Sequence, residues 1–118
     1  MKITELFKEK DVTLSFEVFP PKTQDTYDDV LKAAGEIAAL KPDFMSVTYG
    51  AGGGTSKNTV AIASALKAKG VESMAHLTCV SSTKNEVKGV LNDIKEAGIE
   101  NILALRGDIP EGASFPLE

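Results

Sequence analysis

The sequence has little of several residue types that mark particular classes of protein. Cys79 is the only cysteine and His76 the only histidine in 118 residues. One cysteine cannot form an intrachain disulfide, which suits a reducing compartment, and one cysteine with one histidine cannot make a zinc site. The composition therefore excludes a disulfide-stabilised scaffold, and we expect no metal centre.

The chain also lacks a long apolar run and any cluster of basic residues. No segment approaches the roughly 18 apolar residues of a membrane span, and the charged opening, residues 1–10, does not resemble a signal peptide. The net charge is −4, whereas nucleic acids and anionic membranes attract concentrated lysine and arginine. We expect a cytoplasmic protein whose partners include neither nucleic acid nor a membrane.

Short apolar segments alternate with segments of helical period after residue 10. The predicted strands are Val12–Phe19, Phe44–Tyr49, Val71–Thr78 and Ile102–Gly107. A short helix is expected near Ile3–Lys8. The buried stripes of three further helices are expected at Tyr27, Val30, Leu31, Ala34, Ile37 and Ala38, then Val60, Ala63 and Leu66, then Val87, Val90, Leu91 and Ile94.

Local signals at the ends of these helices agree with that pattern. Thr83 with Glu86 matches a capping box, and we expect Asp25 and Ser56 to cap the other two helices. Glycines at positions 70 and 98 are expected to end helices in the left-handed conformation.

The resulting order, β-α-β-α-β-α-β, predicts a parallel α/β sheet with right-handed crossovers. Either an open doubly wound sheet or part of a (β/α)₈ barrel would fit. A whole barrel needs about 250 residues, so residues 1–118 would be a single partial domain, the N-terminal half of such a barrel. Unpaired edges of a half-barrel invite pairing with another chain, and we therefore expect a homo-oligomer.

Polar side chains recur toward the C-terminal end of each predicted strand. Because strand residues alternate between faces, the sequence groups four sets, each on one face of its strand: Thr13, Ser15 and Glu17; Ser46 and Thr48; Met74, His76 and Thr78; and Ile102, Ala104, Arg106 and Asp108. Parallel α/β folds build their sites at these strand ends. The pattern predicts an active site there.

Each of these residues also has a structural interpretation. Glu17 lies between two apolar residues in a strand suited to burial, where a carboxylate needs a partner or acquires a raised pKa. His76 could be a hydrogen-bonded core residue, Arg106 could pair with Glu17 or Asp108, and Asp108 could be a turn residue.

A glycine-rich segment, residues 50–55, follows the second predicted strand. Its spacing fits neither the dinucleotide fingerprint G-x-G-x-x-G nor the phosphate-binding G-x-x-x-x-G-K-[ST]. Such a loop could let backbone approach a ligand closely, or it could be a flexible connection.

Four motifs resemble those of the methylenetetrahydrofolate reductase family, in the family's order and spacing. They cover the chain from about residue 12 to 110 and read SFEVFPPK from Ser15, SVTYGAGG from Ser46, AHLTC from Ala75 and NILALRGD from Asn101.

This resemblance implies a (β/α)₈ barrel that binds FAD, takes hydride from NADH or NADPH, and reduces 5,10-methylenetetrahydrofolate to the 5-methyl form. The reaction belongs to one-carbon metabolism and supplies methionine biosynthesis. Glu17 matches the general acid that opens the five-membered ring of the folate, and a raised pKa would suit that role. Asp108 matches a catalytic, flavin-contacting residue whose negative charge disfavours the anionic reduced flavin. The family positions that hold FAD correspond to Thr48, His76, Arg106, Gly107 and Asp108.

The sequence departs from the family in two respects. Ser56 stands where the family often has arginine, and the part of the barrel that follows the fourth strand is absent. A non-catalytic, self-associating half-barrel that at most binds flavin is the alternative. An unrelated barrel lyase or aldolase is disfavoured because no lysine lies within the predicted strands.

Overall fold

The computed structural model describes residues 1–21, 24–49, 56–80 and 82–107. Its elements, in chain order, are α1 (Ile3–Glu9), β1 (Ser15–Val18), the 3-10 helix η1 (Gln24–Thr26), α2 (Tyr27–Ala38), β2 (Phe44–Val47), α3 (Ser56–Ala68), β3 (Glu72–Thr78), α4 (Lys84–Glu96) and β4 (Asn101–Leu105). The predicted elements are all present, although β1 begins at Ser15 and not at Val12. Within the ranges described, every helix is too short or too polar to cross a bilayer.

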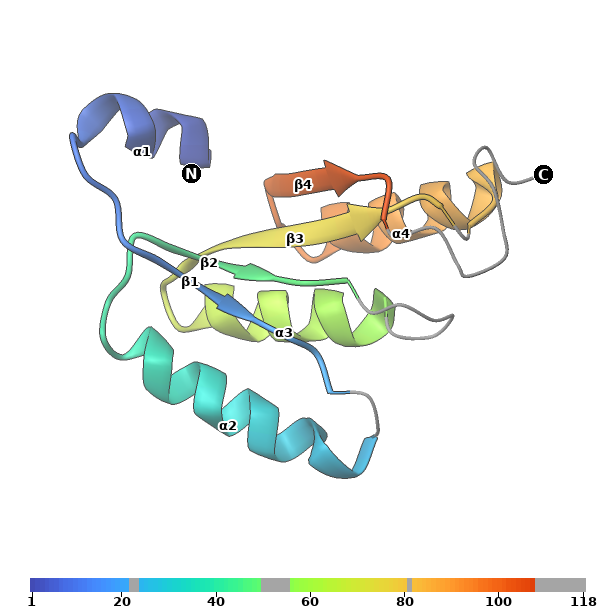
Figure 1. The fold of residues 1–118 in the computed structure, drawn as a ribbon, viewed down its shortest axis with the longest axis horizontal. Coiled ribbons are helices and arrows are strands. Elements are labelled where there is room, and N and C mark those ends of the chain that lie inside the picture. Colours follow the sequence, from blue (N-terminus) through green and yellow to red (C-terminus); the bar gives the residue numbers. More distant parts are fainter. Residues whose placement is uncertain (22–23, 50–55, 81, 108–118) are drawn as a thin grey trace.

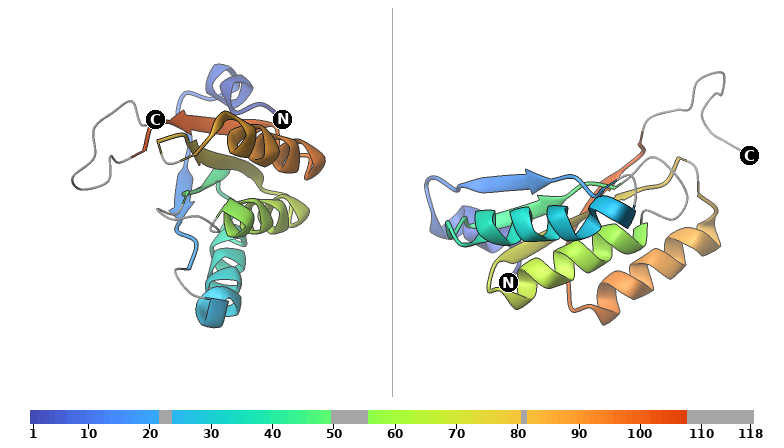
Figure 2. Two further views of the ribbon diagram at one scale, coloured as in Figure 1. Left: turned by 90° about the vertical axis from the view of Figure 1, so that its right-hand side faces the viewer. Right: turned by 90° about the horizontal axis from the view of Figure 1, so that it is seen from below.

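The four strands form one parallel sheet in the order β1-β2-β3-β4. Because successive strands are neighbours and their crossovers share one hand, the three connecting helices lie on the same side. Figures 1 and 2 show α2, α3 and α4 together on one face of the sheet. A doubly wound sheet would carry helices on both faces. This arrangement is that of consecutive units of a (β/α)₈ barrel, as predicted.

The helix-covered side, here called the outer face, holds the main hydrophobic core. Met45, Val47 and Ala75 are fully buried there, against Ile62 and Leu66 of α3. The predicted stripe of α2 also packs into this core, through the residues Tyr27, Val30, Leu31, Ala34, Ile37 and Ala38.

Helix boundaries follow the local signals at three of the five predicted positions. Thr83 Oγ1 accepts from the Glu86 N–H at 3.2 Å, and Glu86 Oε1 accepts from the Thr83 N–H at 3.4 Å, which completes the capping box. Gly70 and Gly98 have φ of +92° and +77°. Because these angles lie in the region that L-residues avoid, glycine ends α3 and α4 without strain.

The predicted cap at Asp25 is wrong. Asp25 lies inside η1, and the N-cap of α2 is Thr26. Ser56 is the first described residue of α3 and the residues before it lie outside the described part of the chain, so its capping role stays a prediction. At Asp25, a turn of 3-10 helix ahead of the α-helix moves the boundary by one residue.

The side of the sheet opposite the helices, here called the inner face, is covered by α1 at one end. Ile3 and Leu6 of α1 pack against Phe44 and Met74, near the N-terminal ends of β2 and β3. Asn101 Oδ1 accepts a hydrogen bond from the Ile3 N–H at 2.8 Å, which ties α1 to the start of β4. The C-terminal end of the inner face is therefore the end that α1 leaves accessible.

Asp43 links the segments that lead into β1 and β2. Its Oδ2 accepts from the Leu14 N–H at 2.8 Å, and its Oδ1 pairs with the Lys10 ammonium. The hydrogen bond from Lys10, aided by that from Leu14, holds the pKa of Asp43 below its ordinary value of 3.8. Because the pKa of Asp43 is lower in the folded state than in the unfolded state, its ionised carboxylate stabilises the fold. This contribution is complete at a pH above the pKa of the unfolded state, and it is lost as the pH falls through the pKa of the folded state.

We therefore expect Asp43→Asn to unfold at lower urea concentration at neutral pH. The variant should also lose less additional stability than the wild type below about pH 4. Urea titrations at neutral and acidic pH measure both effects. Lys10→Met should show the same smaller loss of stability at acidic pH. If both variants lost as much stability at acidic pH as the wild type, the lowered pKa of Asp43 would not contribute to stability.

Candidate functional site

Three side chains from neighbouring strands meet on the inner face, toward the C-terminal ends of the strands. Glu17 of β1 pairs in register with Ser46 of β2. The Ser46 hydroxyl donates to Glu17 Oε1 at 3.2 Å, and His76 Nε2 of β3 lies 3.3 Å from the same oxygen. The predicted convergence of Glu17 and His76 is therefore confirmed. The described contacts of the Glu17 carboxyl are thus with Ser46 and His76.

The burial of this cluster differs from the expectation for Glu17. Ser46 and His76 are 6% and 8% exposed, but the Glu17 side chain is 47% exposed. The predicted burial is wrong because Glu17 points to the inner face, while its apolar neighbour Val18 faces the helix-covered core. Within the described residues, the Glu17 carboxyl is thus only partly covered by other side chains.

His76 carries an unsatisfied buried nitrogen. Its Nε2 has no hydrogen-bond partner among the described residues, because the contact with Glu17 has the distance of an ion pair without the angles of a hydrogen bond. A buried polar atom without a partner costs free energy. This nitrogen therefore has hydrogen-bonding capacity that the described residues leave unused.

Thr48 continues the pairing of β2 one residue beyond the end of the strand. Its N–H donates to the Val18 carbonyl at 2.9 Å, and its own carbonyl accepts from Thr59 Oγ1 of α3 at 2.9 Å. The half-buried Thr48 is therefore held by its backbone, next to the strand end that carries Ser46.

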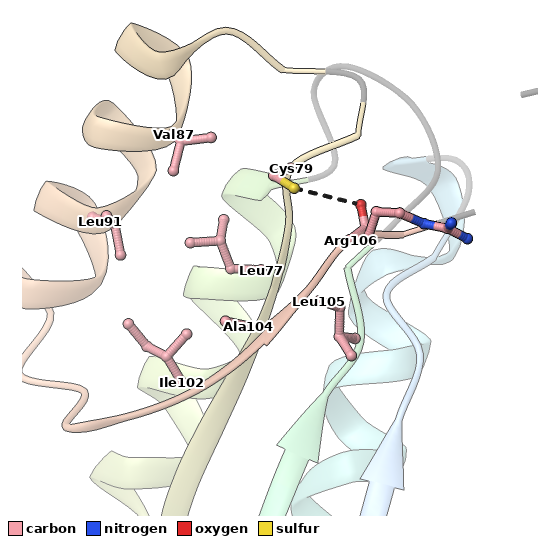
Figure 3. A pocket seen from close by; sticks show the side chains of 8 residues that line it. All are labelled: Leu77, Cys79, Val87, Leu91, Ile102, Ala104, Leu105 and Arg106. Carbon is pink, nitrogen blue, oxygen red and sulfur yellow. Dashed lines mark hydrogen bonds between the residues drawn. The ribbon is translucent and has the colours of Figure 1, made fainter. Parts of the chain in front are cut away.

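Arg106 and Gly107 tie the end of β4 to the segment that follows β3. The Arg106 carbonyl accepts from the N–H groups of Val80 at 2.9 Å and Cys79 at 3.3 Å. Figure 3 shows the Arg106 side chain pointing away from the α4 residues drawn there, and its Nε donates to the Gly107 carbonyl at 3.0 Å. The backbone of this strand end is fixed, while the guanidinium group stays exposed.

Gly107 is required for two separate reasons. Its φ is +89°, a conformation that L-residues rarely adopt. A Cβ at this position would lie 2.9 Å from Thr78 Cβ and 3.0 Å from Val80 Cγ1. Glycine therefore allows the end of β4 to approach the end of β3 closely.

The predicted face of β4 is wrong. The register pairs His76 with Leu103 and Thr78 with Leu105, so these two leucines share the inner face with the site. Ile102 and Ala104 instead lie on the outer face. There they line an apolar pocket of about 530 Å³ together with Leu77, Val87, Leu91 and parts of Cys79, Leu105 and Arg106 (Figure 3).

That pocket also explains the predicted stripe of α4. Ile94 is buried in the core and Val90 packs against it, but Val87 and Leu91 line the pocket. Two further predicted site features, Asp108 and the glycine-rich segment 50–55, lie outside the described residues.

Ser46 is a site residue that the sequence pattern grouped with Thr48 but to which it assigned no role. The signal was present, because alternation within the strand put Ser46 on one face with Thr48. Only the register of β1 against β2 shows that this hydroxyl meets Glu17.

Comparisons with known proteins agree with this geometry. The sequence profile of the methylenetetrahydrofolate reductase family matches residues 2–117. The 5,10-methylenetetrahydrofolate reductase of Escherichia coli K12 is 39% identical over 106 residues, which cover 89% of this chain and 36% of that protein. The Buchnera aphidicola enzyme of the same name is 41% identical over 100 residues, which cover 84% and 34%.

A plant relative gives the same result. The probable methylenetetrahydrofolate reductase (NADH) of Oryza sativa is 40% identical over 112 residues, covering 94% of this chain and 19% of that protein. The chain thus spans about a third of the bacterial relatives and about a fifth of the plant one. Because the family profile matches nearly its whole length, the chain belongs to the methylenetetrahydrofolate reductase family.

Proposed function

We propose that the protein containing these residues reduces 5,10-methylenetetrahydrofolate to 5-methyltetrahydrofolate at the expense of NADH or NADPH. The observation that carries the proposal is the accessible carboxyl of Glu17 beside the buried His76, on the inner face toward the strand ends. Membership of the reductase family supports the choice of reaction. The reaction would serve one-carbon metabolism and methionine biosynthesis.

The residues at this strand end fit a flavin. The buried Nε2 of His76 has no hydrogen-bond partner among the described residues. We propose that His76, Thr48, Arg106, Gly107 and Asp108 hold FAD, which when bound takes hydride from the nicotinamide and passes it to the folate. Asp108 enters this proposal from the family resemblance alone, as a negative charge beside the flavin.

Glu17 is proposed to be the general acid. Opening the five-membered ring of the folate requires a proton on the departing nitrogen, and a carboxyl group within hydrogen-bond reach can donate it. Glu17 lies on the inner face beside Ser46 and His76, and we propose that the folate binds on that face.

The function is tested with a full-length polypeptide that contains residues 1–118. We expect it to purify with a flavin absorbance spectrum, to oxidise NADH or NADPH, and then to yield 5-methyltetrahydrofolate, identified by chromatography. The names of plant relatives specify NADH, so both nicotinamides should be compared at equal concentration. A flavin-free protein that does not oxidise either nicotinamide would contradict the proposal.

Expressed alone, residues 1–118 are expected to self-associate. Among the described strands, β1 and β4 each pair with one neighbour only. Exposed apolar side chains lie at these edges, including Leu14 ahead of β1 and Leu103 and Leu105 in β4. Such edges pair with other chains, and a second copy supplies matching ones. Sedimentation should show a dimer or a larger species. An absorbance assay of the same sample should show negligible oxidation of NADH or NADPH.

A double variant, Leu103→Lys with Leu105→Lys, tests whether the β4 edge drives this association. Charges on an edge strand oppose pairing, so the variant should shift the mass toward the monomer. A wild-type chain that remains monomeric at high concentration would exclude the homo-oligomer for this segment.

A further inference from the structure

Ser46 lies in the inner-face cluster without a role in the function proposed above. It is buried, stands directly across from Glu17 in the sheet, and donates its hydroxyl to Glu17 Oε1 at 3.2 Å. We propose that Ser46 is a positioning residue that holds the Glu17 carboxyl by Oε1, so that Oε2 is the oxygen that delivers the proton. This inference rests on the proposed role of Glu17 as general acid.

The need for an anchor follows from the flexibility of a glutamate side chain. Without a partner it can occupy several rotamers, and restricting them costs conformational entropy. Ser46 comes from β2, which is buried along its length between Phe44 and Val47, so its position is fixed by the core. His76 Nε2 lies 3.3 Å from the same oxygen. Among the described residues, two buried strand side chains thus contact the same oxygen, Oε1.

The direction of the hydrogen bond determines which oxygen carries the proton. In a protonated carboxyl one oxygen bears the hydrogen and the other is the better acceptor. Because the Ser46 hydroxyl donates to Oε1, the proton resides on Oε2. In the proton transfer the Oε2–H bond breaks, an N–H bond forms on the folate ring nitrogen, and the electron pair stays on Glu17. The hydrogen bond from Ser46 then becomes charge-assisted and stronger.

Ser46→Ala in a full-length reductase containing residues 1–118 tests this role. We expect kcat for folate reduction to fall roughly tenfold, because a hydrogen bond to a charged, oriented group is lost. KM for the folate and the rate of flavin reduction by NAD(P)H should not change. Ser46→Thr, which keeps the hydroxyl, should recover most of the lost rate.

Ser73→Ala is the matched control. Ser73 is a buried serine of the adjacent strand β3, but its hydroxyl donates to the Ala63 carbonyl at 2.7 Å, on the outer face. Its removal deletes a comparable buried hydrogen bond away from Glu17. Both half-reactions should keep their wild-type rates, whatever the change in stability.

The outcomes separate this inference from the proposed function. Equal losses in both half-reactions for Glu17→Gln would refute the general acid, and the positioning role with it. If Glu17→Gln slows only folate reduction and Ser46→Ala keeps wild-type rates, the positioning role alone is refuted. Equal losses in both half-reactions for Ser46→Ala would also refute it. If Ser46→Ala does not fold, Ser46→Cys decides: its weak donor should give a selective, partial loss, and a wild-type rate would overturn the inference.

Discussion

Glu17→Gln is expected to reduce folate turnover by about 10²- to 10⁴-fold, the usual contribution of a general acid. Flavin reduction by NADH or NADPH should continue at the wild-type rate, because hydride transfer onto the flavin needs no proton from Glu17. Glutamine keeps the size of the side chain and can still accept from the Ser46 hydroxyl. The two half-reactions, followed separately by stopped-flow absorbance, measure this split.

Glu72→Gln provides the control for this substitution. Glu72 also lies in a strand of the sheet, but at the N-terminal end of β3, where its Oε1 pairs with the N-terminal amine at 2.8 Å. The same change of carboxylate to amide there should leave both half-reactions at wild-type rates. If Glu17→Gln slowed flavin reduction as much as folate reduction, Glu17 would be a structural residue.

Gly107→Ala is expected to lower the free energy of unfolding by about 2–5 kcal/mol. A φ of +89° costs an L-residue about 1–2 kcal/mol. The new Cβ would also lie 2.9 Å from Thr78 Cβ and 3.0 Å from Val80 Cγ1, and overpacking of this kind costs about 1–3 kcal/mol. Urea unfolding of the full-length variant, with the midpoint and slope compared to wild type, measures the loss.

Two other glycines separate the backbone effect from the steric effect. Gly70 has φ of +92°, and no atom lies within 4 Å of the point that a Cβ would occupy, so Gly70→Ala should show the backbone cost alone. Gly89 lies in α4 with open space around it, and Gly89→Ala should stabilise by up to about 1 kcal/mol. A Gly107→Ala variant no less stable than Gly70→Ala would show that the ends of β3 and β4 can separate freely.

The elements and several of their boundaries could be predicted from the sequence because the signals are local. The capping box joins Thr83 to Glu86 within one turn of α4, and the positive φ of Gly70 and Gly98 concerns single residues. Where a neighbouring turn competes, local signals fail, and Asp25 therefore lies within η1.

Family membership could likewise be predicted, because strand-end motifs are contiguous in sequence. What surrounds each strand-end residue could not. The alternation of side chains shows which residues of one strand share a face. It does not show which residues of the next strand lie on that same face of the sheet. The prediction for β4 was wrong for this reason: Leu103 and Leu105, not Ile102 and Ala104, share the inner face.

The sequence by itself therefore determined the order of strands and helices, the parallel sheet and the residues at its C-terminal edge, since periodicity and capping act over a few residues. The tertiary structure alone decided that Glu17 is accessible, that Ser46 and His76 meet at its Oε1, and that Gly107 packs against Thr78. These contacts join residues that are far apart in the sequence, and they depend on strand register, which is set by the packing of the whole sheet against its helices.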